Sequence, residues 1–88
     1  MFKERLNIKF KEFYEAKDIV SAKELSSEIL NMLNEKGLIV YEKIAGYDSL
    51  YIQVFDKYLS KFGLEPNPFY KELDFIRFGL ISQFKHDK

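Results

Sequence analysis

The chain has 88 residues, and its 14 Lys and Arg are balanced by 14 Asp and Glu. A chain of this length forms one domain, so we expect residues 1–88 to fold as a single unit. Zero net charge excludes a whole-molecule field that would draw the protein onto nucleic acid or an anionic membrane, so any DNA binding must come from a local patch. The absence of Cys excludes disulfides, thiolate chemistry and cysteine zinc sites.

The aromatic content is high, with nine Phe and six Tyr. A domain this small buries only about 60 to 65% of its unfolded surface. Part of the aromatic surface is therefore expected to face a partner, either a second copy in a homodimer or another protein. The alternative is a monomer with a densely aromatic core.

The sequence carries no catalytic or metal-binding motif. His86 is the only histidine and lies in the polar C-terminal tail, where we expect it to be exposed. The four glycines are far apart and form no phosphate-binding loop. We therefore expect a protein that is not an enzyme and has no metal or cofactor. No signal peptide and no apolar run of about 20 residues is present, which predicts a soluble cytoplasmic protein without membrane contact.

The first predicted element is a helix over about residues 2–17. Its apolar residues fall within about 120° at 100° per residue, and they are Phe2, Leu6, Phe10, Phe13 and Tyr14. The alternation of Leu6, Ile8 and Phe10 with polar residues would also suit a strand. Glu, Lys and Ala dominate the segment, so helix is the preferred prediction.

A second helix is predicted over residues 22–36. Ser21 is a good N-cap with Glu24 three residues later, and Gly37 can end the helix. One apolar stripe contains Ala22, Leu25, Ile29, Met32 and Leu33. We name the row on the predicted solvent side the polar row, and it contains Lys23, Ser27, Asn31 and Asn34.

A β-hairpin is predicted next, with strands 38–44 and 49–55 around the turn AGYD, residues 45–48. Pairing Ile44 with Ser49 leaves one mostly apolar face for packing on helices. The further pairs are then Ile39 with Val54, Tyr41 with Ile52, and Lys43 with Leu50. The competing interpretation is one helix over residues 49–62.

Two further helices complete the prediction. Asp56 is the expected cap of a short helix over 56–62, which Gly63 ends. Asn67 is the expected cap of a helix over 68–84 with Pro68 in its first turn. Its apolar positions are Phe69, Leu73, Ile76, Leu80 and Phe84, with Phe75, Phe78 and Ile81 on other sides. The predicted class is therefore α+β, with four helices and one hairpin.

Residues 13–54 resemble the winged helix-turn-helix family. The likeness rests on LNEKGLI, residues 33–39, where a helix passes through glycine into the first of two strands. The resemblance implies a small winged-helix-like domain with a turn at 18–21, a recognition helix at 22–36 and the hairpin as the wing. A thinner resemblance is to the C-terminal half of the GNAT acyltransferase fold, at KDIVSAKEL and YLSKFGLEPNP. Val20 replaces the glycine of its cofactor loop, so that resemblance implies a relic without acyl-CoA chemistry.

The winged-helix resemblance implies a small DNA-binding module, such as a dimeric transcription regulator. Asn suits adenine, and Lys suits guanine or phosphate, so the polar row would enter the major groove of duplex DNA. The expected DNA contacts are this row, two residues near the hairpin turn and three lysines on phosphates: Lys23, Ser27, Asn31, Asn34, Lys43, Tyr47, Lys9, Lys11 and Lys17. The alternative function is a protein–protein interaction module, such as a viral or plasmid-borne inhibitor or adaptor, which uses its aromatic surface.

Overall fold

The computed structural model describes residues 1–44 and 49–84, with side-chain surroundings for residues 1–43 and 50–77. The elements in chain order are α1 (Phe2–Glu15), α2 (Ile19–Glu35), β1 (Ile39–Ile44), β2 (Ser49–Val54), the 3₁₀ helix η2 (Asp56–Phe62) and α3 (Pro66–Phe84). The described chain is thus a small α+β domain, as expected. The helical prediction for the first segment is confirmed, and the strand alternative is wrong.

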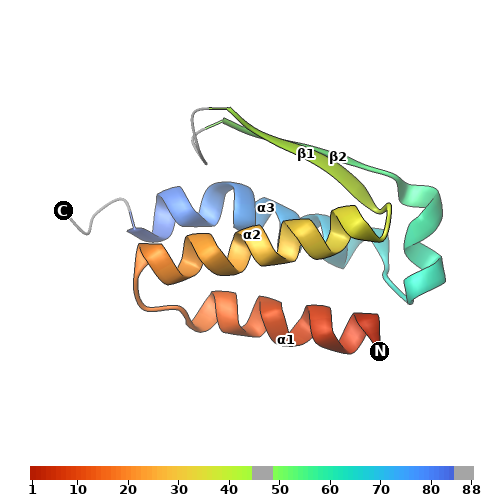
Figure 1. Ribbon diagram of the computed structural model, residues 1–88, viewed down its shortest axis with the longest axis horizontal. Helices are drawn as coiled ribbons and strands as arrows, with labels where there is room; N and C mark the ends of the chain where they lie inside the picture. Colours follow the sequence, from red (N-terminus) through yellow and green to blue (C-terminus); the bar gives the residue numbers. More distant parts are fainter. Residues whose placement is uncertain (45–48, 85–88) are drawn as a thin grey trace.

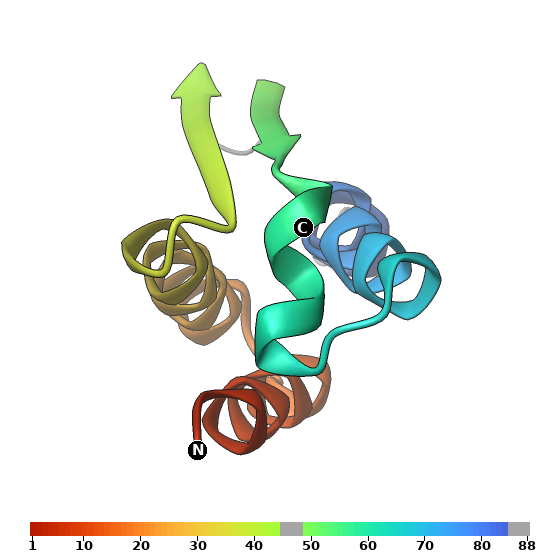
Figure 2. The same ribbon diagram turned by 90° about the vertical axis from the view of Figure 1, so that its right-hand side faces the viewer.

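The helices form a three-membered group with the hairpin on one side. α1 and α2 lie side by side and antiparallel, and α3 packs against α2 (Figures 1 and 2). The hairpin covers α2 and α3 on the side away from α1, while η2 closes one end (Figure 2). Consecutive elements therefore tend to be neighbours in space.

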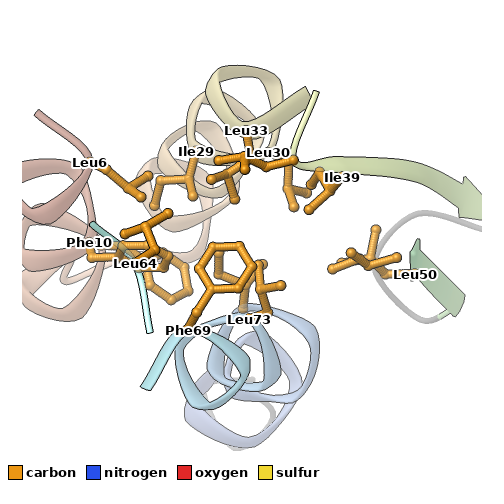
Figure 3. Packing of buried hydrophobic residues seen from close by; sticks show 14 of the residues in the cluster. Leu6, Phe10, Ile29, Leu30, Leu33, Ile39, Leu50, Leu64, Phe69 and Leu73 are labelled. Atoms are coloured by element: carbon orange, nitrogen blue, oxygen red, sulfur yellow. The ribbon is translucent and has the colours of Figure 1, made fainter. Parts of the chain in front are cut away.

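The core lies between the three long helices and the inner face of the hairpin (Figure 3). Leu6 and Phe10 of α1 point toward α2 and α3, and all the core side chains are almost fully removed from water. The buried apolar residues are Leu6, Phe10, Phe13, Ala22, Ile29, Leu30, Leu33, Leu38, Ile39, Leu50, Ile52, Leu59, Leu64, Phe69, Leu73 and Ile76. The described residues of the predicted helix stripes are therefore in the core or packed against it, with the exception of Tyr14, which is exposed. Leu80 and Phe84 lie outside the described side chains.

The hairpin has the predicted register. Ile39 pairs with Val54, Tyr41 with Ile52, and Lys43 with Leu50 in the antiparallel sheet β1-β2. The interpretation of residues 49–62 as one helix is wrong, because β2 ends at Val54 and η2 follows as a separate helix. The predicted turn AGYD lies outside the described residues.

The start of α2 differs from the prediction. Asp18 is the N-cap, and its Oδ1 accepts a hydrogen bond from the backbone N–H of Ser21 at 2.8 Å. Ser21 was expected to be the cap, and residues 18–21 were expected to be a turn. Both expectations are wrong, because Ile19 to Ser21 already form the first turn of the helix.

The caps of the last two helices also differ. Phe55, which has no side-chain cap bond, is the N-cap of η2, whereas Asp56 lies inside the helix and accepts a hydrogen bond from the hydroxyl of Tyr70. α3 begins at Pro66, so Asn67 lies inside the helix and is not its cap. Both residues have side chains typical of a helix start, but each already belongs to the helix, because η2 begins at Asp56 and α3 begins at Pro66.

Two helices end on glycine in the same way. Gly37 and Gly63 have φ of 72° and 71°, a left-handed conformation that favours glycine. At α2, the N–H of Gly37 donates to Asn34 O and that of Leu38 donates to Leu33 O, both at 3.0 Å. This is the Schellman arrangement, which satisfies the last carbonyls of a helix. It turns the chain from α2 directly into β1, as the sequence predicts.

Candidate functional site

The polar row of α2 lies on the flank that faces the hairpin. Lys43 Nζ donates to Ser27 Oγ at 2.6 Å, and the hydroxyl of Tyr41 donates to Asn31 Oδ1. Strand β1 therefore reaches two members of the row. Lys23 and Asn34, the two ends of the row, are exposed.

The outer face of α2, opposite its buried residues, is acidic. Ala22, Ile29 and Leu33 are buried, and the side of the helix turned about 180° from them holds three exposed carboxylates by the 3.6-residue period. These are Glu24, Glu28 and Glu35. A helix that enters the major groove would carry this negative charge toward the phosphates.

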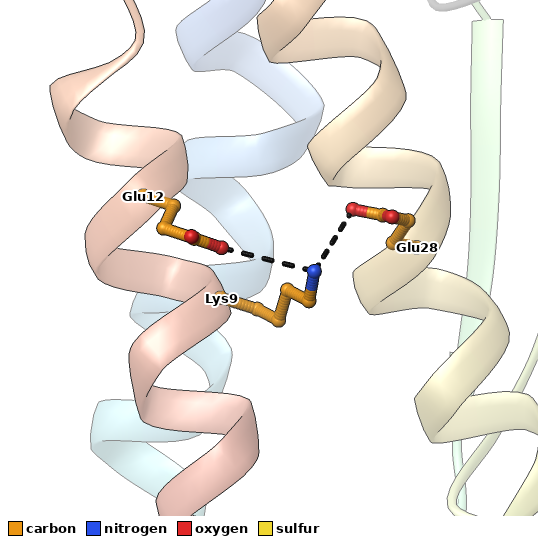
Figure 4. A network of polar contacts seen from close by, with 3 residues as sticks. All are labelled: Lys9, Glu12 and Glu28. Carbon is orange, nitrogen blue, oxygen red and sulfur yellow. Dashed lines mark hydrogen bonds and ion pairs between the residues drawn. The ribbon is translucent and has the colours of Figure 1, made fainter.

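The three lysines expected on phosphates have different surroundings. Lys9 Nζ lies 3.2 Å from Glu28 Oε2 and 3.7 Å from Glu12 Oε1, so it bridges α1 and α2 through two carboxylates (Figure 4). Lys11 and Lys17 are exposed, on α1 and just after it. Tyr47 lies outside the described residues. Among the described residues, the expected phosphate contacts thus lie on α1 or just after it, whereas the polar row lies on α2.

A group of exposed apolar side chains lies where α1 passes into α2. We name it the apolar end and define it as Tyr14, Ile19, Val20 and Phe75. The rings of Tyr14 and Phe75 are 4.7 Å apart between centroids and nearly perpendicular, which joins α1 to α3. Val20 is 63% exposed and Ile19 is 40% exposed at the start of α2. Four large apolar side chains in contact with water at one end of a small domain are typical of a contact surface.

Sequence reasoning missed most of the apolar end. Tyr14 belongs to the predicted apolar face of the first helix, yet it is 40% exposed. Ile19 and Val20 fall in the predicted turn at 18–21, because the sequence predicts a helix over 22–36 with Ser21 as its N-cap. Phe75 was recognised as lying off the main stripe of its helix. The signal that could have found the surface was Asp18, whose capping role places two apolar residues in an exposed first turn.

Tyr14 also pairs with Glu72 of α3. Burial, then the negative charge of Glu72, then the hydrogen bond between the two groups raise the pKa of Tyr14 to about 12. Burial raises the pKa of the Glu72 carboxyl, while the hydrogen bond from Tyr14 lowers it in part. The pair puts a polar, half-buried contact beside the rings of the apolar end.

The described residues form neither a metal-binding cluster nor a membrane-spanning helix. Among residues 1–44 and 49–84, no three His, Cys, Asp or Glu side chains lie close enough to hold a metal ion. His86 lies outside this part of the chain. Within the same range, none of the helices combines the length and apolar character needed to cross a membrane.

Comparison of the chain with protein-family models, with curated proteins and with solved structures finds no match in any of the three.

Proposed function

We propose that the protein is a non-enzymatic interaction module that binds another protein through its apolar end. The observation that carries the proposal is the exposure of Ile19 and Val20 at the start of α2, together with the Tyr14–Phe75 ring pair at the end of α1. Fully burying a side chain of this size contributes about 1.5 to 3 kcal/mol relative to leaving it in water. Covering the apolar end would therefore stabilise a complex.

The composition of the surface fits a protein partner. Aromatic residues are enriched at the centres of protein interfaces, where they supply most of the contact energy. The apolar end has two such rings, and the Tyr14–Glu72 pair gives it a polar border. The partner can be a second copy of the chain or a different protein, and both share the same apolar chemistry.

Duplex DNA is the second candidate partner. The helix–glycine–hairpin junction at Gly37 favours it, since this junction carries the winged-helix resemblance. Three features weigh against it: the acidic outer face of α2, the hydrogen bonds from Tyr41 and Lys43 to the polar row, and the side-by-side packing of α1 and α2. The helices of a helix-turn-helix cross at about 90 to 120°.

Site-specific photo-crosslinking tests the protein partner. The photoreactive residue p-benzoylphenylalanine is placed at Val20 in one variant and at Ile8 in the other, and each is expressed in the native cell. Ile8 is the matched control, because it is 58% exposed but lies on the outer face of α1. We expect adducts from Val20 alone. Equal adducts from both positions, or adducts from Ile8 alone, would contradict the proposal.

The adduct mass and light scattering then identify the partner. If light scattering gives twice the 10.5 kDa of the chain, and Val20→Glu returns the mass to one chain, the partner is a second copy. If the adduct holds a different protein, Val20→Glu should weaken its binding by about tenfold, which corresponds to 1.4 kcal/mol. Circular dichroism must show the same helix content for the variant.

A salt titration tests the DNA candidate. Binding to mixed-sequence duplex DNA should weaken linearly in log K against log salt, with a slope of about 0.9 for each phosphate contact. The double variant Lys23→Ala, Asn31→Ala should lose affinity. Absence of binding at about 0.05 M salt removes this candidate.

A further inference from the structure

A second surface lies at the other end of the molecule. The first turn of α1, the last residues of α2 and the whole of η2 meet there (Figure 2). Because α1 and α2 are antiparallel, this end is opposite the apolar end. We name it the basic end and define it by four exposed lysines around three half-buried rings: Lys3, Lys36, Lys57, Lys61, Phe2, Tyr58 and Phe62.

Three of the four lysines lie close to the rings. Lys57 Nζ and Lys61 Nζ lie 5.1 and 5.0 Å from the centroid of the Tyr58 ring. Lys36 Nζ, at the end of α2, lies 5.6 Å from the centroid of the Phe2 ring. Each distance is within the range of a cation–π contact. The ammonium groups are therefore positioned by the fold before any partner arrives.

The remaining contacts make the base of the surface apolar. The rings of Phe2 and Phe62 meet edge to face with centroids 5.1 Å apart, which links α1 to η2. The stem of Lys3 lies over Gly63, since its Cδ is 3.5 Å from the position that a Cβ on Gly63 would take. A β-carbon at position 63 would therefore be in ordinary van der Waals contact with the side chain of Lys3.

Two adjoining hollows open between these side chains. One, of about 360 Å³, is lined by Lys36, Gly37, Tyr58, Lys61 and Phe62. The other, of about 340 Å³, is lined by Met1, Phe2, Lys3, Glu4, Lys61, Phe62 and Gly63. Lys61 and Phe62 are common to both. Among these lining residues, Glu4 is the one carboxylate against three lysines, so the hollows carry positive charge over aromatic walls.

We infer that the basic end binds an acidic segment of a partner protein, with carboxylates on the lysines and apolar side chains in the two hollows. Charge complementarity selects an anionic partner, and the aromatic walls select one that also has apolar groups. A single-stranded nucleic acid fits less well, because it needs ring faces on which bases stack. Here the faces of Tyr58 and Phe2 are covered by lysines.

This surface is separate from the apolar end and adds a second contact to the proposed interaction module. The two share no residue, so the variants that test one leave the other intact. A failure at the basic end is thus distinguishable from a failure of the proposed function.

Fluorescence anisotropy tests the inference on the full chain. The probe is a fluorescein-labelled synthetic peptide that alternates glutamate with phenylalanine. We expect binding to weaken as the salt concentration rises from about 0.05 to about 0.5 M, because added salt shortens the Debye length and screens the charges. The variant Lys36→Gln, Lys61→Gln should bind about tenfold more weakly, as the loss of two surface charge pairs implies. The matched control Lys11→Gln, Lys71→Gln makes the same charge change on other exposed positions and should bind like the wild type.

Four outcomes would overturn the inference. The first is no binding of the acidic peptide, and the second is equal loss in the test and control variants. The third is tighter binding of labelled oligothymidine than of the peptide, which would assign the surface to nucleic acid. The fourth is a lowered melting temperature of Lys36→Gln, Lys61→Gln with unchanged binding, which would assign the lysines to stabilising helix ends.

Discussion

Lys43 Nζ of the hairpin lies 2.6 Å from Ser27 Oγ of α2, and this hydrogen bond fastens β1 to the flank of the helix. The bond from Tyr41 to Asn31 lies on the same flank, so strand β1 is held along α2 by two polar contacts. Ser27 and Asn31 of the polar row thus have a structural role in the described fold.

The contact predicts a coupling energy between hairpin and helix. In a double-mutant cycle with Lys43→Met and Ser27→Ala, we expect a coupling of about 0.5 to 1 kcal/mol, the net value of an ordinary hydrogen bond. Urea unfolding measures each free energy. The control cycle combines Lys43→Met with Ser60→Ala on η2. The changes in the free energy of unfolding of these two single variants should sum to that of the double variant. Additivity in the first cycle as well would mean that the bond contributes nothing in solution.

The cap of α2 predicts unequal effects at two neighbouring polar residues. Asp18→Ala removes the acceptor of the Ser21 N–H bond and should lower the free energy of unfolding by about 1 kcal/mol. Ser21→Ala removes the exposed bond from its hydroxyl to Asp18 Oδ2, 3.2 Å long, but leaves the backbone donor in place, so its effect should stay within about 0.5 kcal/mol. Thermal denaturation of the two variants compares them. If Ser21→Ala lowered the stability more than Asp18→Ala, Ser21 would be the cap.

The core predicts a large effect for one isoleucine and a small effect for another. Ile29 is fully buried between the helices, whereas Ile8 is 58% exposed on α1. Ile29→Ala should lower the free energy of unfolding by about 2 to 5 kcal/mol, since it leaves a cavity. Ile8→Ala should change it by less than about 0.5 kcal/mol. Chemical denaturation would contradict the packing if the two losses were similar.

The Tyr14–Glu72 pair predicts a stability change at high pH. The folded-state pKa of Tyr14 is about 12, above the ordinary value of about 10. The folded chain therefore keeps this proton when the unfolded chain has lost it. The stability that the site contributes is complete below about pH 10 and is lost as the pH rises toward 12.

Tyrosinate absorbance and urea unfolding at several pH values measure this behaviour. Tyr14→Phe should remove the last step of the absorbance titration, and its free energy of unfolding should fall less steeply between pH 10 and 12 than that of the wild type. Tyr51→Phe, which removes an exposed phenol of β2, should keep that last step. If the last titration step remained in Tyr14→Phe, the pairing of Tyr14 with Glu72 would be contradicted.

Local patterns were enough to predict the elements. The β-branched and aromatic alternation of 38–44 and 49–55 predicts the observed register, because shifting one strand by one residue would turn the apolar residues of that strand, such as Ile39 or Ile52, to the solvent. The glycine ends of α2 and η2 were predicted for a similar reason: a left-handed residue is needed there. The caps were harder, since Asp18 and Ser21 are equally good cap formers and only the backbone geometry decides between them.

The candidate surfaces could not be predicted in the same way. The apolar end depends on Phe75 of α3 meeting Tyr14 of α1, a contact between residues far apart in the sequence. The basic end likewise needs Phe2, Lys36 and Lys61 from three separate elements. The charge pattern along one helix cannot show which residues of other elements lie next to it in the fold. It also cannot show that Lys9 is engaged by Glu28 of the neighbouring helix.

The order of the elements has a consequence for how the chain folds. α1 packs on the helix that follows it, α2 leads directly into β1, and the two strands pair across a short connection. Most early contacts thus close short loops, and chains rich in such local contacts fold faster than chains dominated by non-local pairing. α3 must then dock across the assembled α1, α2 and hairpin. We expect the docking of this last helix to be the step that completes the native state.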